Sequence, residues 1–357
     1  MTKNPTSIPL TQIGKQEQKA ISQQLLSKKI AESKMLNITD DNLVKEYSSK
    51  GINVNTIREE IQKATKHPYF QAGRDIVKPL KKTGNILGVY RKLAELSSKR
   101  KKIERVPYIS RADFLENYYA TNTPVIITDI MSEWPALNSW KPEYFQKKYG
   151  DIMVEIEFTS QPIKTDNKLF KYFEKRLKNN QKLLPLGDYV DMVVNGASGN
   201  DYYMTANNHN LEKEEMKPLL EEIVVFPEYL DKNKIDKKIF LFFGPPGTTT
   251  PLHYDPFNSL FSQVYGRKQL KLISPNQTPF LYNQIGNFSD VDCENPSFDK
   301  HPLFKNVTVM DIIVEPGETL FIPVGWWHEV KALDISISVS FSNFLFPNEY
   351  DFFGSPV

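Results

Sequence analysis

His253 and Asp255 are the residues whose types and spacing first suggest chemistry. Residues two positions apart in a β-strand point to the same side, so this pair can present an imidazole and a carboxylate to one metal ion. The candidate for a third ligand is His328, which follows a Pro-Val-Gly turn and two tryptophans. Two histidines and one carboxylate, with the remaining coordination positions open, are typical of non-haem Fe(II) oxygenases.

A His-x-Asp pair alone is a weak signal, because a histidine in apolar surroundings is more often a packed core residue. Here Lys268 follows on the same stretch of chain, and a Pro-x-Gly-Trp-Trp-His segment lies in the same strand-rich region. The joint pattern is therefore more specific than the pair. The other three histidines lack such context, and we predict that none of them is a ligand: His67, His209 and His301.

Composition limits the class of protein that could carry this site. The 357 residues include 45 basic and 43 acidic ones, a net charge of +2 that does not indicate a nucleic-acid partner. Cys293 is the only cysteine, which excludes an intrachain disulfide and fits a reducing compartment. No signal-peptide pattern is visible, and no run approaches the ~20 apolar residues of a membrane span. We expect a cytoplasmic protein without membrane contact.

Residues 1–105 form an N-terminal helical segment that ends in a basic linker. Thr39 is the expected N-cap of one helix and Gly51 its C-terminal stop. The basic run at 98–102 is interpreted as a solvated linker, with a binding patch for an acidic partner as the alternative. Apolar residues recur at helical spacing in two stripes, Ile21, Leu25, Leu26 and Ile30, and Ile57, Ile61 and Ala64.

Residues 106–357 are predicted to form one catalytic domain of short strands separated by turn residues. This pattern favours a sandwich or barrel of the jelly-roll kind. Residues 334–341 alternate strictly, with apolar side chains on one side and serines on the other, so the serine side is expected to line the site. The predicted strands are Val125–Ile127, Ile152–Phe158, Ile239–Phe243, Ser262–Val264, Gln269–Ile273, Ile312–Val314, Thr319–Ile322 and Ile335–Phe341.

Several motifs occur in an order that resembles the JmjC-type cupin dioxygenases. They are Thr-Pro-Val-Ile-Ile at 123–127, Glu-Trp-Pro-Ala at 133–136, Tyr-Tyr-Met at 202–204, Thr-Pro-Leu-His-Tyr-Asp-Pro at 250–256, Gln-Val-Tyr-Gly-Arg-Lys at 263–268 and the Trp-Trp-His segment. The resemblance covers about 106–346. It is in particular a resemblance to the hydroxylase branch that includes the factor-inhibiting-HIF asparaginyl hydroxylase and the JmjC arginyl hydroxylases. It implies a mainly β fold, with a double-stranded β-helix (jelly-roll, cupin) core and flanking helices.

The resemblance also implies the cofactors and the main site residues. Fe(II) would be held by His253, Asp255 and His328, with 2-oxoglutarate as cosubstrate and O2 as oxidant. Lys268 would pair with the distal carboxylate of 2-oxoglutarate, because a buried anion needs a cation to offset its desolvation. The alternative for Lys268 is a solvated hairpin lysine.

Other positions match residues that lie around the cosubstrate in the family. Thr250 and Tyr203 match hydroxyl groups that help to bind the carboxylate, although Thr250 could be a turn hydroxyl and Tyr202 could replace Tyr203. Ser340 matches a small polar residue on the last strand. Trp327 is expected to be a wall of the site.

One position departs from the family pattern. Many relatives place an asparagine six residues after the first histidine ligand, where this chain has Ser259, with Asn258 just before it. Which of the two contacts the cosubstrate stays open.

The branch that the chain resembles implies hydroxylation of a side-chain carbon in a peptide or protein. The alternatives are a hydroxylase of a free small metabolite and a non-catalytic cupin that only binds a ligand. Long polar loops at 158–180 and 282–301 would shape that choice. Few residues follow the last strand, so a homodimer would use the N-terminal helices.

Overall fold

The structure is a computed structural model that describes residues 10–35, 37–96, 102–158, 181–196, 198–235 and 237–350. Most of the predicted basic linker and of the loop at 158–180 therefore lies outside the described residues. The chain divides into two compact units, Met1–Leu87 and Gly88–Val357. The division falls inside a helix, and each unit is described by itself below.

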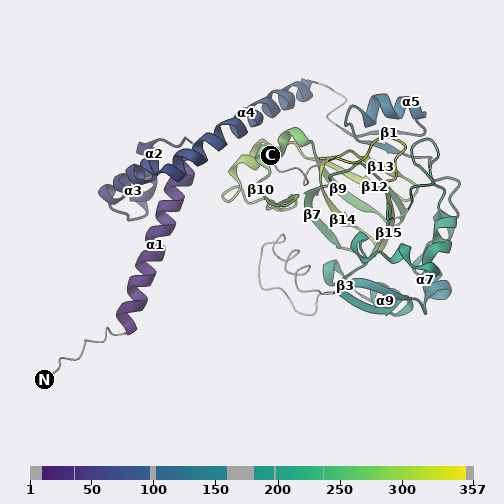
Figure 1. Cartoon of the computed structure of the whole chain (residues 1–357). Coiled ribbons are helices and arrows are strands. Elements are labelled where there is room, and N and C mark those ends of the chain that lie inside the picture. Colours follow the sequence, from purple (N-terminus) through teal and green to yellow (C-terminus); the bar gives the residue numbers. More distant parts are fainter. Residues whose placement is uncertain are drawn as a thin grey trace. The chain divides into compact units, whose positions relative to one another are not determined.

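The first unit is helical (Figure 1), with α1 (Leu10–Met35), α2 (Asp40–Ser49), α3 (Val54–Lys66) and most of α4 (Pro68–Leu96). The Thr39 side chain accepts a hydrogen bond from the Asn42 amide at 3.3 Å, and Gly51 has a φ of +83°, so both predicted helix ends are confirmed. The buried core consists of Ile30, Leu43, Tyr47, Ile57 and Ile61.

One member of the predicted apolar stripes lies outside that core. Leu25 is 56% exposed, so it does not share the buried face with Leu26 and Ile30. It directly precedes Leu26, which packs against the core, and consecutive helical residues lie about 100° apart. The side chain of Ile21 lies outside the described part of the chain.

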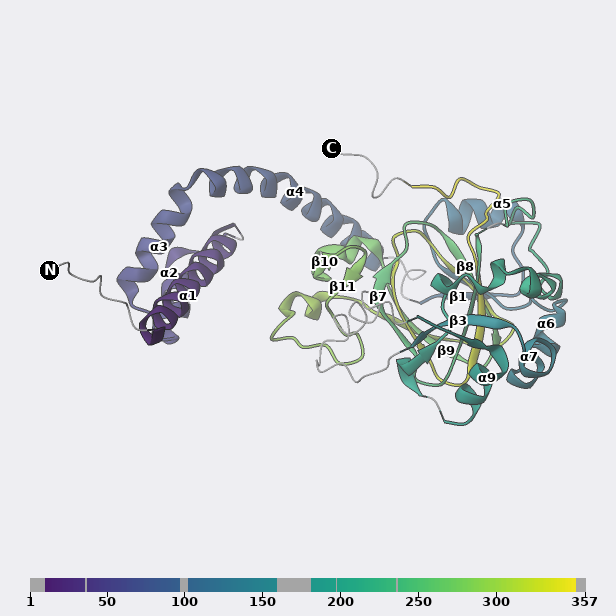
Figure 2. The same ribbon diagram turned by 60° about the horizontal axis from the view of Figure 1, so that its bottom comes forward.

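The second unit contains two six-stranded sheets that face each other (Figure 2). The first sheet has the order β1 (Glu104–Val106), β2 (Val125–Ile127), β13 (Thr319–Ile322), β8 (Ser259–Tyr265), β15 (Ser336–Phe341) and β6 (Ile239–Gly244). The second sheet has the order β10 (Asn283–Ile285), β11 (Phe288–Ser289), β7 (Thr249–Tyr254), β14 (Trp327–Ala332), β9 (Lys268–Ile273) and β12 (Met310–Val314). All eight predicted strands are confirmed, with shifts at some ends.

A third sheet and several helices surround the first sheet. The third sheet has the order β4 (Gln181–Pro185), β3 (Met153–Phe158) and β5 (Tyr202–Tyr203). The helices are α5 (Arg111–Phe114), which continues into the π-helical η2 (Leu115–Tyr119), α6 (Pro135–Ser139), α7 (Pro142–Tyr149) and α9 (Leu186–Val194). The 3₁₀ turns are η3 (Gly199–Asp201), η4 (Ala206–Asn208), η5 (Asn210–Glu212), η6 (Glu214–Glu222), η7 (Pro275–Phe280) and η8 (Pro302–Asn306).

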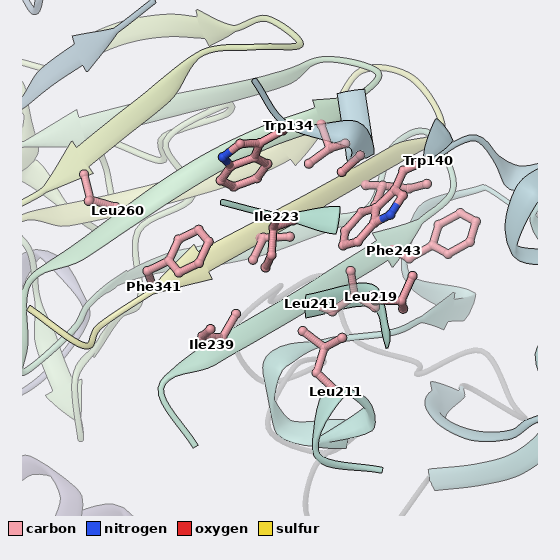
Figure 3. Packing of buried hydrophobic residues seen from close by; sticks show 14 of the residues in the cluster. Trp134, Trp140, Leu211, Leu219, Ile223, Ile239, Leu241, Phe243, Leu260 and Phe341 are labelled. Atoms are coloured by element: carbon pink, nitrogen blue, oxygen red, sulfur yellow. The ribbon is translucent and has the colours of Figure 1, made fainter. Parts of the chain in front are cut away.

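The alternation along β15 separates the two faces of the first sheet. Val339 and Phe341 belong to the large cluster that packs beneath the helices, together with Trp134 and Trp140 (Figure 3). The alternate residues, Ser336, Ser338 and Ser340, are buried on the opposite face, which looks toward the second sheet.

A smaller apolar cluster fills part of the space between the two sheets. Phe261 and Leu320 of the first sheet pack there with Leu270, Leu272 and Val314 of the second. The second unit is thus a jelly-roll core with flanking helices, as the sequence predicted. Among the described helices, none combines the length and the apolar character that a membrane span needs.

Candidate metal centre

Strand register brings the two histidines and the lysine to the inner face of the second sheet. His328 of β14 pairs with His253 of β7 on one side and with Leu272 of β9 on the other. Directly opposed residues in antiparallel strands point to the same face, and Lys268 shares the face of Leu272 because the two residues are four positions apart in the strand. His253, His328 and Lys268 therefore face the first sheet together.

A β-bulge in β7 adds Thr250 to this face. Thr250 pairs with Val330 while His253 pairs with His328, so three residues of β7 span the length of two on β14. Without the extra residue, alternation would turn Thr250 and His253 to opposite faces; with it, both point inward. Pro251 lies in the bulge, where the missing amide donor is tolerated.

The three predicted ligands converge. One donor atom from each of His253, Asp255 and His328 lies within 4.8 Å of the others, and Nε2 of His328 is 3.7 Å from Oδ2 of Asp255. Nδ1 of His253 donates to the Pro251 carbonyl at 2.8 Å, and Nδ1 of His328 donates to the Trp326 carbonyl at 3.0 Å. Both Nε2 lone pairs are therefore left for a metal.

The donor set fits Fe(II), since two imidazoles and one carboxylate leave coordination positions for a cosubstrate and O2. Burial lowers the pKa of His253 to about 4; the nearby His328 acts in the same direction, and Asp255 acts against it. The ring is thus neutral at physiological pH, as a ligand must be. In the described part of the chain, this is the one group of acidic, histidine or cysteine side chains that could hold a metal.

Lys268 lies on the same face and is 2% exposed. Its Nζ lies 5.2 Å from the ring centroids of Phe242 and Phe261 and 5.9 Å from that of Tyr203. Burial lowers its pKa to about 7, and no acidic side chain among the described residues forms an ion pair with it. A buried ammonium group surrounded by rings is suited to bind an anion that arrives with a ligand. The solvated-hairpin alternative is wrong.

Tyr203 is the tyrosine near Lys268, whereas the ring of Tyr202 packs against that of Phe158, with 5.3 Å between the ring centroids. Gly244 makes room for Tyr203, because a Cβ atom there would lie 2.6 Å from Cδ2 of the tyrosine ring. The geometry therefore supports Tyr203 over Tyr202.

Ser340 and Ser259 share the inner face of the first sheet. Ser340 pairs with Phe261, and Ser259 precedes Phe261 by two residues on β8. The amide of Asn258 is instead occupied, since Oδ1 accepts from Val324 N at 2.8 Å and Nδ2 donates to Asn348 and Tyr350. Of the two open alternatives, Ser259 is therefore the one on the inner face, whereas the Asn258 amide already has protein partners.

Trp327 is not a wall of the site, contrary to expectation. It is adjacent to His328 on β14 and therefore points to the outer face. There it packs with Leu252 and Ile273, and its Nε1 donates to Thr278 Oγ1 at 2.9 Å.

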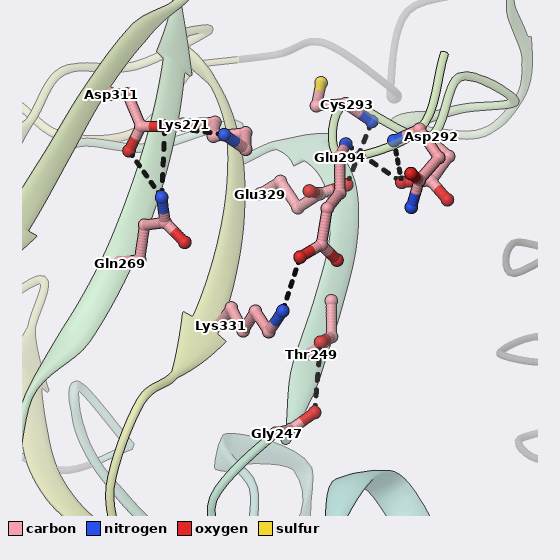
Figure 4. Close-up of polar contacts among 11 residues, drawn as sticks. Gly247, Thr249, Gln269, Lys271, Asp292, Cys293, Glu294, Asp311, Glu329 and Lys331 are labelled. Carbon is pink, nitrogen blue, oxygen red and sulfur yellow. Dashed lines mark hydrogen bonds and ion pairs between the residues drawn. The ribbon is translucent and has the colours of Figure 1, made fainter. Parts of the chain in front are cut away.

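The outer face of the second sheet also carries polar residues, but these form pairs (Figure 4). Lys271 and Gln269 both contact Asp311, and Lys331 pairs with Glu294. Thr249, on the outer face of β7, donates from Oγ1 to the Gly247 carbonyl at 3.2 Å.

The remaining histidines have other partners. Nδ1 of His67 accepts from Tyr69 N, His209 contacts Glu212 at 2.7 Å, and His301 contacts Asp290 at 3.2 Å. Among the described residues, none of these three histidines belongs to the group that could hold a metal ion.

A jelly roll with this inner face has the features of the cupin-type non-haem iron oxygenases. Residues 111–351, more than half of the chain, match the family described as "Cupin-like domain". The chain belongs to this family and, within it, to the JmjC-type 2-oxoglutarate oxygenases, whose cofactors are Fe(II), 2-oxoglutarate and O2.

Several curated proteins are similar to this chain. Lysine-specific demethylase 8 of Xenopus tropicalis is 32% identical over 64% of this chain and 49% of its own length. JmjC domain-containing protein D of Dictyostelium discoideum is 33% identical over 67% and 55%, respectively. tRNA wybutosine-synthesizing protein 5 of Gallus gallus is 26% identical over 65% and 74%. The chain thus spans about half the length of the first two relatives.

Proposed function

We propose that this protein is an Fe(II)- and 2-oxoglutarate-dependent oxygenase that hydroxylates a side-chain carbon of a peptide or protein residue. Residues 106–357 form its catalytic domain. When bound, the iron would couple the decarboxylation of 2-oxoglutarate to oxidation of a C–H bond. The decarboxylation releases succinate and CO2.

The observation that carries the proposal is the joint placement of the triad and Lys268 on one face. His253, Asp255 and His328 hold Fe(II). Lys268 pairs with the distal carboxylate of 2-oxoglutarate, because it is a buried cation without an acidic partner among the described residues.

Neutral side chains complete the cosubstrate site. Thr250 and Tyr203 donate to the same carboxylate, since the bulge turns Thr250 inward and the Tyr203 ring lies beside Lys268. Ser340 and Ser259 lie on the opposite sheet and provide small polar contacts.

Fe(II)-dependent release of succinate is the direct test, measured with and without candidate peptides. A peptide substrate should stimulate release and gain the mass of one oxygen atom. If succinate release requires neither Fe(II) nor His253, the protein is not this kind of oxygenase. A non-catalytic cupin would bind the ligand without turnover.

Two other substrate classes compete with a peptide. A free small metabolite would stimulate succinate release where peptides do not. A tRNA substrate is suggested by the name of one relative, but the near-balanced charge of this chain gives no support to a polyanionic partner. Adding tRNA to the same assay separates these cases.

Demethylation is a further outcome of the same chemistry, and the name of one relative points to it. Hydroxylation of an N-methyl group would release formaldehyde and lower the peptide mass. A stable gain of oxygen on an unmethylated peptide favours hydroxylation of a side-chain carbon.

We also propose that the chain forms a homodimer through its N-terminal helices. The support is α4, on which apolar side chains are exposed: Ile76, Leu80, Ile86, Val89, Tyr90, Leu93 and Leu96. Light scattering of the full chain and of an Ile76→Glu, Leu80→Glu variant would test this. A cytoplasmic location is proposed from the single cysteine.

A further inference from the structure

We infer that Asn258 is a positioning residue for the metal centre and that it links the C-terminal residues 342–350 to the two segments that carry the ligands. The inference rests on the iron site proposed above. It concerns residues that act through the ligands rather than on the cosubstrate.

Two hydrogen bonds join the segments that carry Asp255 and His328. The Gly325 amide donates to the Asp255 carbonyl at 3.0 Å, and the Val324 amide donates to Oδ1 of Asn258 at 2.8 Å. Gly325 has a φ of +77°, which allows the turn to bring its amide there. Since this turn leads directly into β14, the two bonds restrain the spacing between the two ligands.

Asn258 is buried and uses its whole amide. It is 1% exposed, and Nδ2 donates to Oδ1 of Asn348 at 2.9 Å and to the Tyr350 hydroxyl at 3.1 Å. Asn348 also binds the backbone of Asn258, accepting from its amide at 2.7 Å and donating to its carbonyl at 3.0 Å. Truncating Asn258 would leave buried polar groups without partners.

The C-terminal segment is itself anchored. Nδ2 of Asn348 also donates to the Ser342 carbonyl at 2.9 Å, at the end of the β15 region. The hydroxyl of Tyr119, from η2, donates to the Pro347 carbonyl at 2.9 Å. Asn348 is therefore anchored in the fold and restrains Asn258. Asn258 in turn restrains the turn before His328 through its bond to Val324.

Contacts of this kind influence a metal through its ligands. Loss of a group that is hydrogen-bonded directly to a ligand typically weakens metal binding by about 10- to 100-fold. Asn258 acts one step further out, through the Val324 backbone, so a smaller effect is expected. We therefore expect Asn258→Ala to affect metal affinity and coordination geometry, beyond any general loss of stability.

Asn343 provides a matched control on the same C-terminal segment. It is 3% exposed, and its Nδ2 donates to the Asp231 carbonyl at 2.9 Å. Among the hydrogen bonds of the described residues, none joins its side chain to 255–258 or 323–328. Asn343→Ala should therefore destabilise the fold without acting on the metal centre.

The experiment measures Co(II) binding to the metal-free full chain by calorimetry and by its visible absorption spectrum, with thermal unfolding of the metal-free form beside it. Asn258→Ala should raise the Kd for Co(II) by about three- to tenfold, less than the loss of a group bonded directly to a ligand, and alter the spectrum. Asn343→Ala should lower the Tm but leave Kd and spectrum unchanged. Asn348→Ala should raise the Kd for Co(II) less than Asn258→Ala does. The Asn258→Ala, Asn348→Ala double variant should have a Kd no higher than that of Asn258→Ala alone.

Wild-type Kd and spectrum in Asn258→Ala would overturn the inference, and so would an equal loss in Asn343→Ala. If Asn258→Ala does not fold, Asn348→Ala carries the same comparison, and its wild-type Kd would overturn the inference. A wild-type chain whose Co(II) binding is absent or insensitive to His253→Ala would instead refute the proposed metal site.

Discussion

Lys268 and Lys271 lie on the same strand, β9, and face opposite sides of the second sheet. Burial opposes the charge on Lys271, but the hydrogen bond to Asp311, at 2.6 Å, together with the negative charges of Asp311 and Glu329 outweighs that effect and raises the pKa of Lys271. Lys268 is more deeply buried, has no acidic partner among the described residues, and has its pKa lowered to about 7.

Lys271 thus has a structural partner in the protein, whereas Lys268 has the surroundings of a lysine that binds an anionic ligand. A buried cation without a partner costs free energy in the folded protein, so selection for stability alone would not retain Lys268. Lys268 lies on the same face as the metal triad, and in the function proposed above 2-oxoglutarate would bring the missing carboxylate.

The largest expected effect separates the histidines of the inner face from the others. His253→Ala or Asp255→Ala should lower kcat/KM for succinate release by at least about 10³-fold, because metal catalysis contributes several kcal/mol. His301→Ala, whose ring contacts Asp290, should retain near wild-type turnover. A normal rate of succinate release in either triad variant would refute the ligand assignment.

Replacing each of the two lysines separately with methionine tests the comparison directly. Lys268→Met should raise the KM for 2-oxoglutarate by about 100-fold, since the distal carboxylate would be buried without a cation. Lys271→Met should leave KM unchanged, because Lys271 faces the outer side. Steady-state kinetics with varied 2-oxoglutarate measures both, and an equal effect of the two variants would remove the distinction.

The lowered pKa of Lys268 predicts a pH dependence of cosubstrate binding. Binding requires the ammonium form, which the free protein loses above a pKa of about 7. The affinity of the Mn(II)-loaded protein for 2-oxoglutarate should thus fall as pH rises from 7, approaching tenfold per pH unit. Lys268→Arg keeps its charge and should lose this dependence; if it retains the full slope, another group is responsible.

The two lysines should also have opposite effects on stability. The folded-state pKa of Lys268 lies below the unfolded value, so the unfolded state binds more protons between about pH 7 and pH 10.5. The free-energy cost of burying the charged Lys268 side chain is therefore complete below pH 7 and disappears as pH rises toward 10.5. Lys268→Met should therefore stabilise the metal-free protein at pH 7, by on the order of 1–3 kcal/mol.

Lys271→Met should instead destabilise slightly, by less than about 1 kcal/mol, because the Lys271–Asp311 pair is partly exposed. Denaturant unfolding at pH 7 and pH 10 measures both variants. A destabilising Lys268→Met at pH 7 would mean that the folded protein already supplies a partner for this lysine.

The smallest expected effect concerns the neighbouring residues Thr249 and Thr250, which point to opposite faces of β7. Thr250→Val should raise the KM for 2-oxoglutarate by about three- to tenfold, the loss of one neutral hydrogen bond. Thr249→Val should leave KM unchanged, because Thr249 faces outward and bonds the Gly247 carbonyl. A larger effect of Thr249→Val would mean that the bulge does not turn Thr250 inward.

Much of the fold and the triad was predictable because the signals are local. Thr319–Ile322 is a strand with the predicted ends, and the alternation at 334–341 correctly indicated which side faces the second sheet. The edge strands β1, β4 and β10, which carry few β-branched residues, were missed, and so was the central strand β14, which carries His328. Their partners, rather than their own sequences, determine them.

Other features depend on contacts that a single sequence does not reveal. Strict alternation would turn Thr250 away from His253, and only the pairing with β14 shows the extra residue. The role of Asn258 depends on Asn348, ninety positions later in the chain. The position of Trp327 was predictable, since a strand that points His328 inward must point its neighbour outward.

The most direct test of the shared inner face is calorimetric binding of 2-oxoglutarate with and without Mn(II). We predict that Mn(II) tightens binding in the wild type, that His253→Ala abolishes this gain, and that Lys268→Met weakens binding while Lys271→Met does not. Binding that is independent of Mn(II), or equal in the two lysine variants, would contradict a common site for the metal triad and Lys268.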